Sequence, residues 1–290
     1  MTNIFAPFEP EGDEPRRRRF KPIPVRVLLP NMITLLSLCL GLTAIRMAME
    51  GRLELAIGAI VLAGVLDALD GRIARLLQTS SRFGAELDSL ADFVCFGVAP
   101  GIILFQWGIS NLRGVGWIAI LVYAMCAALR LARFNVMLED PTRPAFAGNF
   151  FVGMPAPAAA LVVLLPVYLG FLGLPQTIVT SVFAMLYVLA IALVMVSRIP
   201  TWSGKKVGSR VPREYVLAVF VLVVLFTALL ISYPWEVLSI GSLLYLAAIP
   251  VAYMHYKKLE RIHLAAAGGT VHPPAEPDEP DEEDRPSRFN

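Results

Sequence analysis

The sequence is poor in the residues that build disulfide frameworks and zinc centres. It has only three cysteines and three histidines among 290 residues. The cysteines lie in separate apolar stretches, at Cys39, Cys95 and Cys126, and none belongs to a CxxC pair. This spacing supports neither a disulfide framework nor a structural zinc site. We interpret the cysteines as apolar packing residues.

Charge is also scarce. Charged residues make up 17% of the chain and hydrophobic residues 57%, with a mean hydropathy of +0.65. Soluble domains contain only about 45–50% apolar residues, so the composition indicates an integral membrane protein. The basic stretch "PRRRRFKPIPVR" is not followed by a short apolar segment with a small-residue cleavage site. We therefore expect no removable signal peptide and a cytoplasmic N-terminal arm.

Long apolar runs determine the predicted fold class. A helix needs about 20 residues to cross the hydrocarbon core, and eight runs approach this length: 27–48, 53–76, 88–110, 115–135, 156–173, 177–197, 214–232 and 236–256. The sequence thus predicts an all-α polytopic integral membrane protein with about eight transmembrane helices. The expected organisation is a basic arm (1–26), a transmembrane domain (27–256) and an acidic, largely disordered tail (257–290).

The distribution of basic residues predicts the orientation. With a cytoplasmic N-terminus, 22 of the 25 lysines and arginines fall on the cytoplasmic side, and only Arg46, Arg52 and Arg113 fall on the other. This bias follows the positive-inside rule and predicts that both termini are cytoplasmic. A basic cytoplasmic face suits anionic lipid headgroups, so we expect membrane lipids, and no nucleic acid, as partners.

Four aspartates stand out within "LDALDGRIARLLQTSSRFGAELDSLADF" (66–93) because charge is costly in hydrocarbon. They are Asp67, Asp70, Asp88 and Asp92. At about 100° per residue, the first two share one helix face with Gly71, Ala74 and Arg75. The last two are spaced i, i+4 on the next predicted helix. A hairpin of the two helices would bring both carboxylate pairs together.

Converging carboxylates repel one another unless a cation is present. Oxygen ligands without His or Cys favour Mg²⁺ or Mn²⁺, which also bind substrate phosphates. Gly71 and Ala74 remove side-chain bulk from the same helix face and leave room for a flat or phosphorylated ligand. Small residues alone are also typical of helix packing, but their combination with four acids favours a metal-assisted phosphate site.

Written as Asp67-x2-Asp70-Gly71-x2-Ala74-Arg75-x8-Gly84-x3-Asp88-x3-Asp92, this segment resembles the signature of the CDP-alcohol phosphotransferase family at every position. That family has six core membrane helices, so eight would be two more. Four other segments resemble its membrane-bound phosphatidylserine synthase branch: "LPNMITLLSLCLGL" (29–42), "ALRLARFNV" (128–136), "NFFVGMPAPAAA" (149–160) and "MVSRIPTWSGKK" (195–206).

The resemblance implies transfer of a phosphatidyl group from CDP-diacylglycerol to L-serine, which gives phosphatidylserine and CMP. It implies two divalent ions, Mg²⁺ or Mn²⁺, with Asp67 and Asp88 bound to both, Asp70 to one and Asp92 to the other. Asp92 is also implied as the general base for the serine hydroxyl. A homodimer in a bacterial-type inner membrane, with the active site at the cytoplasmic face, is expected on the same ground.

Substrate contacts follow in part from the resemblance. It places Gly71, Arg75 and Ser81 against CDP, beside the small Ala74, and Asn31 and Thr34 are further candidates for the same nucleotide. A serine carboxylate is well held by a guanidinium fork, so we expect Arg130 or Arg133 to bind it, with Asn135 nearby. Such arginines also commonly extend to lipid phosphates.

Other functions remain open at this point. Glycerol phosphate or inositol phosphate would be accepted by the same chemistry, although a phosphorylated acceptor calls for more arginines beside the aspartates. A cation-coupled transporter would place acids through the membrane depth, whereas the later spans contain almost none at their centres. A membrane scaffold without catalytic activity would not explain why all four aspartates are present.

Overall fold

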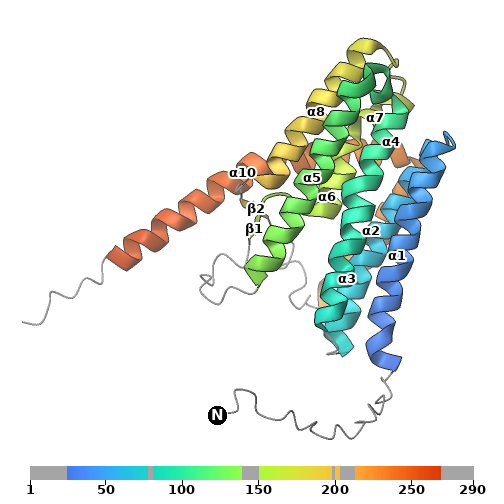
Figure 1. The fold of residues 1–290 in the computed structure, drawn as a ribbon. Helices are drawn as coiled ribbons and strands as arrows, with labels where there is room; N and C mark the ends of the chain where they lie inside the picture. The colour runs from blue at the N-terminus through green and yellow to red at the C-terminus, as the bar shows by residue number, and fades with distance from the viewer. Residues whose placement is uncertain (1–24, 78–80, 139–149, 198–199, 203–212, 269–290) are drawn as a thin grey trace, which may run out of the picture.

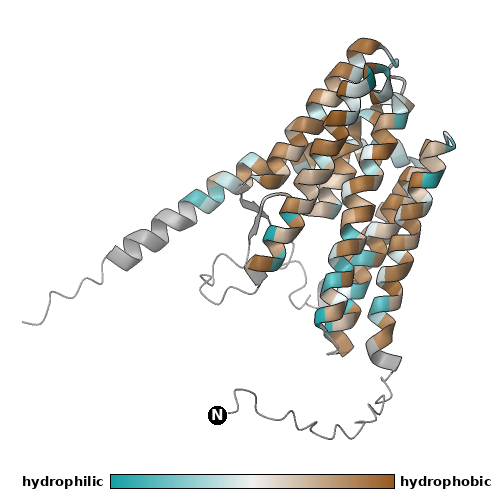
Figure 2. Cartoon of the chain, viewed as in Figure 1, coloured by the Kyte–Doolittle hydropathy of each residue, from teal (hydrophilic) through white to brown (hydrophobic). Residues whose placement is uncertain are grey.

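The computed structural model describes residues 25–77, 81–138, 150–197, 200–202 and 213–268. Apolar helices run side by side through most of this part (Figures 1 and 2). Among the described residues, six helical segments are long and apolar enough to cross a membrane: Leu28–Met49, Arg82–Trp107, Ile109–Met137, Ile178–Val196, Tyr215–Ser232 and Pro234–Lys257. This architecture is that of a polytopic integral membrane protein, as predicted.

The other two predicted spans are helical but differ from these six. Helix α2 (Leu53–Leu77) has 25 residues, the same length as α1 (Val25–Met49), and carries Asp67 and Asp70 in its C-terminal half. The predicted span at 156–173 is broken into α6 (Ala156–Val163) and α7 (Leu165–Phe171). Pro166 has no N–H for the ladder, which accounts for the break.

Helices α1 and α2 form an antiparallel hairpin. Its turn depends on Gly51, whose φ of +77° lies in the left-handed region that favours glycine. The N–H of Arg52 then donates to the Met47 carbonyl at 2.9 Å and closes the turn. Buried alanines on both helices, including Ala44, Ala56 and Ala63, allow the backbones to approach closely. The hairpin holds the aspartate end of α2 beside the start of α1.

The third span is one continuous rod of three helical segments, two α-helical and one π-helical. It comprises α3 (Arg82–Asp92), the π-helical segment η1 (Phe93–Val98) and α4 (Ala99–Trp107). The wider turn of the π-helical segment η1 interrupts the usual hydrogen bonds from each N–H to the carbonyl four residues earlier. Here the buried hydroxyl of Tyr123, on α5 (Arg113–Leu138), donates to the Phe96 carbonyl at 2.9 Å. This bond fixes the rod against α5 just beyond Asp92.

The short 3-10 segment η2 (Ile109–Leu112) leads into α5 (Arg113–Leu138), which packs against α8 (Ile178–Val196). A small antiparallel ribbon, absent from the all-α prediction, joins the segments that follow α5 and α8. Its strands are β1 (Phe150–Val152) and β2 (Pro200–Trp202), and Phe151 pairs with Thr201. The ribbon therefore fixes two connections that are distant in sequence.

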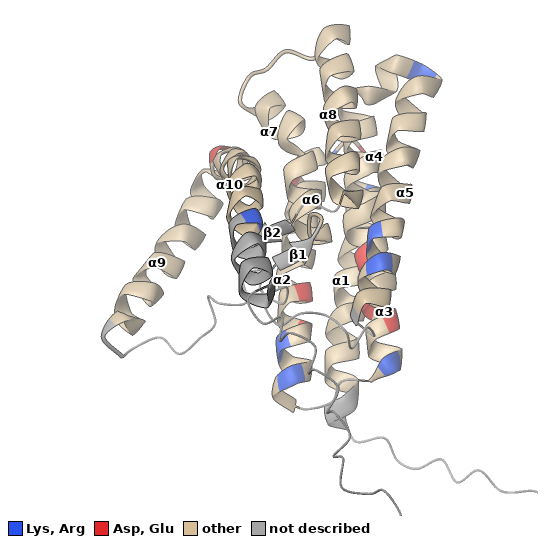
Figure 3. Cartoon of the chain, turned by 90° about the vertical axis from the view of Figure 1, so that its left-hand side faces the viewer, with Lys and Arg blue, Asp and Glu red and all other residues tan. Residues whose placement is uncertain are grey.

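Two helices complete the described chain. Helix α9 (Arg213–Ser232) lies outside the bundle beside α10 (Pro234–Gly268) (Figure 3). Trp235 packs against Phe171 of α7, with ring centroids 4.5 Å apart, and so joins α10 to the bundle. Helix α10 continues to Gly268, beyond its predicted end at 256, so the beginning of the predicted tail is helical. Residues 1–24 and 269–290 of the predicted arm and tail lie outside the described residues.

Candidate functional site

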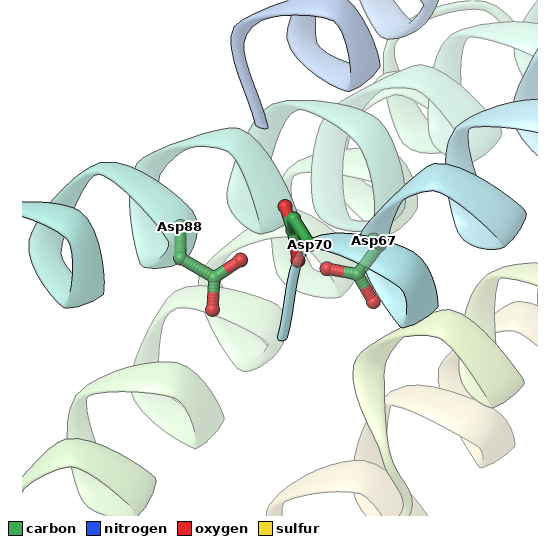
Figure 4. A group of neighbouring side chains, drawn as sticks. All are labelled: Asp67, Asp70 and Asp88. Atoms are coloured by element: carbon green, nitrogen blue, oxygen red, sulfur yellow. The ribbon is translucent and has the colours of Figure 1, made fainter. Parts of the chain in front are cut away.

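Three aspartates from two helices meet at one point. Asp67 and Asp70 come from α2 and Asp88 from α3, and their carboxylates converge (Figure 4). Each offers one oxygen, and these three oxygens lie within 4.8 Å of one another. The structure therefore brings together three of the four aspartates that the sequence pattern predicts as metal ligands.

The start of α3 places Asp88 opposite α2. Ser81 is the N-cap of α3, and its hydroxyl accepts a hydrogen bond from the backbone N–H of Gly84 at 3.0 Å. Such a cap satisfies one of the free N–H groups in the first helical turn. Asp88 then lies on the face of α3 that is turned to α2. Acidic and basic residues of α2, α3 and α5 gather in this half of the bundle (Figure 3).

Asp70 is the most enclosed of the three. Its residue surface is only 5% exposed, and its Oδ2 accepts a hydrogen bond of 2.7 Å from the hydroxyl of Thr34 on α1. Thr34 is equally buried, at 5%. The α1–α2 hairpin therefore fixes the orientation of this carboxylate.

One carboxylate oxygen of Asp88 has no partner among the described residues. Its Oδ1 is buried and has no hydrogen-bond partner within the described part of the chain. Among those residues, no lysine or arginine nitrogen lies within 4.0 Å of a carboxylate of the three aspartates. Buried carboxylates that are not paired directly with a cationic side chain repel one another, and a divalent cation with oxygen ligands would neutralise them. The three side chains therefore fit a metal ion.

Asp92 lies one helical turn beyond Asp88, at the end of α3, and is not part of the three-oxygen group. Its carboxylate approaches that of Asp67 closely enough for a side-chain contact. The Arg130 guanidinium, on α5, acts electrostatically on both acids. Asp92 therefore lies beside Asp67, where the Arg130 charge acts on both carboxylates.

A cleft of about 190 Å³ opens beside the cluster. All six residues predicted to contact CDP line it: Asn31, Thr34, Gly71, Ala74, Arg75 and Ser81. Asp70 and Asp88 form part of the same wall, so the cleft and the acids are one site. Space for a Cβ atom is open at Gly71, with no atom within 4 Å. Arg75 donates from Nε to the Gly71 carbonyl at 2.9 Å, which orients its guanidinium along this wall.

Three lining residues were not among the predicted nucleotide contacts: Pro30, Gly84 and Ala85. Gly84 belongs to the family signature, and the structure explains its place. A Cβ atom there would lie 2.9 Å from Oδ1 of Asn31. Pro30 belongs to the segment 29–42 that resembles the synthase branch. No comparable signal in the sequence marks Ala85, because its position depends on how α1 and α3 pack.

The three predicted serine contacts lie near the end of α5 but have different neighbours. Arg130 is buried, at 9% exposure, and lies over the Phe134 ring at 5.7 Å from its centroid. Arg133 instead donates to the Val196 carbonyl at 2.6 Å, at the end of α8. Asn135 donates to the Ser89 hydroxyl at 3.0 Å and so joins α5 to α3. Of the three, Arg130 is the one whose charge acts on Asp67 and Asp92.

Comparisons with known proteins agree with this arrangement. Residues 27–196 match the family described as CDP-alcohol phosphatidyltransferase, and residues 214–250 match CDP-alcohol phosphatidyltransferase 2. The first match contains the acidic cluster, the cleft and Arg130. The second covers most of α9 and the first half of α10.

Several relatives carry the name CDP-diacylglycerol--serine O-phosphatidyltransferase. The protein of Mycobacterium leprae (strain TN) is 41% identical over 243 residues, which are 82% of this chain and 77% of the relative. That of Helicobacter pylori (strain ATCC 700392 / 26695) is 36% identical over 232 residues, covering 78% and 90%. That of Bacillus subtilis (strain 168) is 37% identical over 133 residues, covering 46% and 71%. The family match at residues 27–196 covers more than half of this chain, and the chain therefore belongs to the CDP-alcohol phosphatidyltransferase family.

Proposed function

We propose that this protein transfers the phosphatidyl group of CDP-diacylglycerol to L-serine and releases phosphatidylserine and CMP. The observation that carries the proposal is the acidic cluster of Asp67, Asp70 and Asp88 in the wall of a cleft large enough for part of a nucleotide. The names of the relatives, which align over most of this chain, support serine as the acceptor.

Asp67 and Asp88 would help to hold both of two divalent ions, with Asp70 completing one site and Asp92 the other. Mg²⁺ and Mn²⁺ suit this set because all donors are carboxylate oxygens. When bound, such ions neutralise negative charge on a diphosphate as its phosphoanhydride bond breaks. The unpartnered Asp88 Oδ1 supports this assignment.

The cytidine nucleotide would occupy the cleft between α1, α2 and α3. The absence of side-chain atoms at Gly71 lets a phosphate approach the α2 backbone. Arg75 supplies a positive charge on the same wall. The first turn of α3, capped by Ser81, adds backbone N–H groups and the positive end of a helix dipole. These groups would bind and orient the diphosphate beside the acids.

Asp92 would act as the general base. It lies beside Asp67 and on the side of the cluster that faces Arg130. Its carboxylate would take the proton of the serine hydroxyl as that oxygen forms a bond with the phosphatidyl phosphorus. The bond from this phosphorus to the bridging oxygen breaks at the same centre, and CMP departs with the bridging oxygen.

Arg130 would hold the serine carboxylate. Its guanidinium is buried on the Asp92 side of the cluster, where an acceptor hydroxyl must lie to reach that base. Charge-assisted bonds from a guanidinium suit a carboxylate. Arg133 is less suited, because one of its N–H groups already holds the Val196 carbonyl.

We further propose that the site faces the cytoplasm in a bacterial-type inner membrane, with both termini on that side, and that the protein is a homodimer. The excess of basic residues on the cytoplasmic side supports the orientation. Accessibility of single engineered cysteines to a membrane-impermeant reagent would test the orientation, and cross-linking in native membranes would test the dimer.

The decisive experiment measures CMP release by the purified protein in detergent with CDP-diacylglycerol, Mg²⁺ or Mn²⁺, and a panel of alcohols. We expect release with L-serine that stops when the metal is chelated, and stops in Asp92→Asn. Glu86→Gln is the matched control, since Glu86 is an exposed acid on the same helix. CMP release only with glycerol phosphate or inositol phosphate would mean that this compound, and not serine, is the acceptor. No release with any alcohol would refute the enzymatic proposal.

A further inference from the structure

The predicted nucleotide contact Thr34 has a different partner in the structure. Its hydroxyl lies 2.7 Å from Oδ2 of Asp70 and 3.1 Å from the carbonyl of Pro30. One hydroxyl has one hydrogen, and a carboxylate is a stronger acceptor than a neutral carbonyl. The hydrogen therefore goes to Asp70.

Burial makes this bond important for Asp70. Both residues are only 5% exposed, so little water is available to replace a lost donor. The bond links two helices and fixes rotation of the carboxylate about its Cβ–Cγ bond. Thr34 is itself constrained, because a β-branched side chain in a helix has few accessible rotamers.

We propose that Thr34 is a positioning residue that holds Asp70 ready to bind a divalent cation. This inference rests on the proposed function, because it takes Asp70 as a metal ligand. Groups that orient metal ligands typically change metal affinity or activity by about 10- to 100-fold when they are removed. Asn31, three residues earlier on α1, lines the same cleft, and a Cβ atom at Gly84 would lie 2.9 Å from its Oδ1.

The test measures Mn²⁺ binding to the purified, substrate-free protein, with free Mn²⁺ followed by electron paramagnetic resonance. Thr34→Val keeps the shape of the side chain and removes the hydroxyl, and we expect Mn²⁺ affinity to fall by about tenfold or more. Thr34→Ser keeps the donor and should stay within about threefold of the original affinity. Thr43→Val is the matched control, because Thr43 lies on the same helix and donates only to the Cys39 carbonyl.

The outcomes separate this inference from the proposed function. Unchanged Mn²⁺ affinity in Thr34→Val, together with weakened affinity in Asp70→Asn, overturns the role of Thr34 and leaves the metal site in place. Unchanged affinity in Asp70→Asn overturns the metal site and the role of Thr34 with it. Gel filtration of the metal-free protein checks folding, and Thr34→Ala replaces Thr34→Val under the same criteria if that variant aggregates.

A kinetic measurement distinguishes positioning from direct nucleotide contact. With saturating Mn²⁺, Thr34→Val should keep the KM for CDP-diacylglycerol while the Mn²⁺ concentration needed for half-maximal CMP release rises. A raised KM for CDP-diacylglycerol with an unchanged Mn²⁺ requirement means that Thr34 contacts the nucleotide, and this result overturns the inference.

Discussion

Gly84 on α3 and Asn31 on α1 approach each other so closely that a Cβ atom at position 84 would lie 2.9 Å from the Asn31 Oδ1. The same Cβ atom would lie 3.1 Å from Oγ of Ser81, which caps α3. Both contacts occur in the wall of the cleft. The absence of a side chain at this position therefore lets α3 begin against α1 with the cleft open between them.

The substitution Gly84→Ala should therefore damage substrate binding. The added methyl group must displace Asn31 or the Ser81 cap, and we expect kcat/KM for CDP-diacylglycerol to fall about tenfold or more, which corresponds to about 1.4 kcal/mol. The measurement is the rate of CMP release against CDP-diacylglycerol concentration. Gly58→Ala is the control, because a Cβ atom at Gly58 meets nothing within 4 Å. Equal kinetics in the two variants would contradict the steric explanation.

The acidic cluster should make stability depend on divalent metal. Its three oxygens lie within 4.8 Å of one another, so Mn²⁺ should raise the thermal midpoint of the folded protein in detergent. Binding at 100 times Kd adds about 2.7 kcal/mol. Asp88→Asn should reduce this gain and, because it removes one repelling charge, unfold at a higher temperature than the original protein when both are metal-free. A wild-type midpoint that does not respond to Mn²⁺ would count against the site.

Much of this arrangement follows from local patterns. Each of the eight predicted apolar runs is helical in the structure, because a membrane span needs a continuous apolar run, although the run at 156–173 is broken into α6 and α7. Helical periodicity places Asp67 and Asp70 on one face, and a short connection to α3 brings Asp88 opposite them. The cluster was therefore predictable, because spacing along one helix and across one hairpin determines which of the aspartates lie close together.

The remaining features depend on contacts between distant segments. Pairing of β1 with β2 joins residues 150–152 to 200–202, and neither strand has a strong pattern of its own. The π-helical segment Phe93–Val98 is fixed by Tyr123 from another helix. The different neighbours of Arg130 and Arg133 likewise depend on how α5 packs against α3 and α8. Short-range patterns do not carry this information.

These two arginines should give different phenotypes. Arg130→Ala should raise the KM for serine by about tenfold or more, because a charge-assisted bond to the carboxylate contributes about 1.5–3 kcal/mol. The KM for CDP-diacylglycerol should change little. Arg133→Ala should instead lower the thermal midpoint, because it removes the 2.6 Å bond to the Val196 carbonyl, and keep the KM for serine. Serine titrations at saturating CDP-diacylglycerol measure both effects, and an increased serine KM only in Arg133→Ala would reverse the assignment.

The break between α6 and α7 supplies a test of stability that is separate from the site. Pro166 has no N–H to donate to the carbonyl of Val162, four residues earlier, and the hydroxyl of Tyr187 on α8 donates to that carbonyl at 2.8 Å. Tyr187→Phe should therefore lower the free energy of unfolding by about 1–3 kcal/mol, because a buried carbonyl loses a partner. Tyr215→Phe, on the exposed surface of α9, is the control.

The double variant isolates the cause. Pro166→Ala restores an N–H at position 166, so Tyr187→Phe should cost less in that background than in the original protein, by about 0.5 kcal/mol or more. Thermal unfolding of the four proteins in detergent, followed by circular dichroism, measures this coupling. Equal losses in both backgrounds would mean that the Tyr187 hydroxyl does not compensate for the proline. A smaller loss in the Pro166→Ala background would show that the Tyr187 hydroxyl stabilises the break between α6 and α7, which interrupts the predicted span at 156–173.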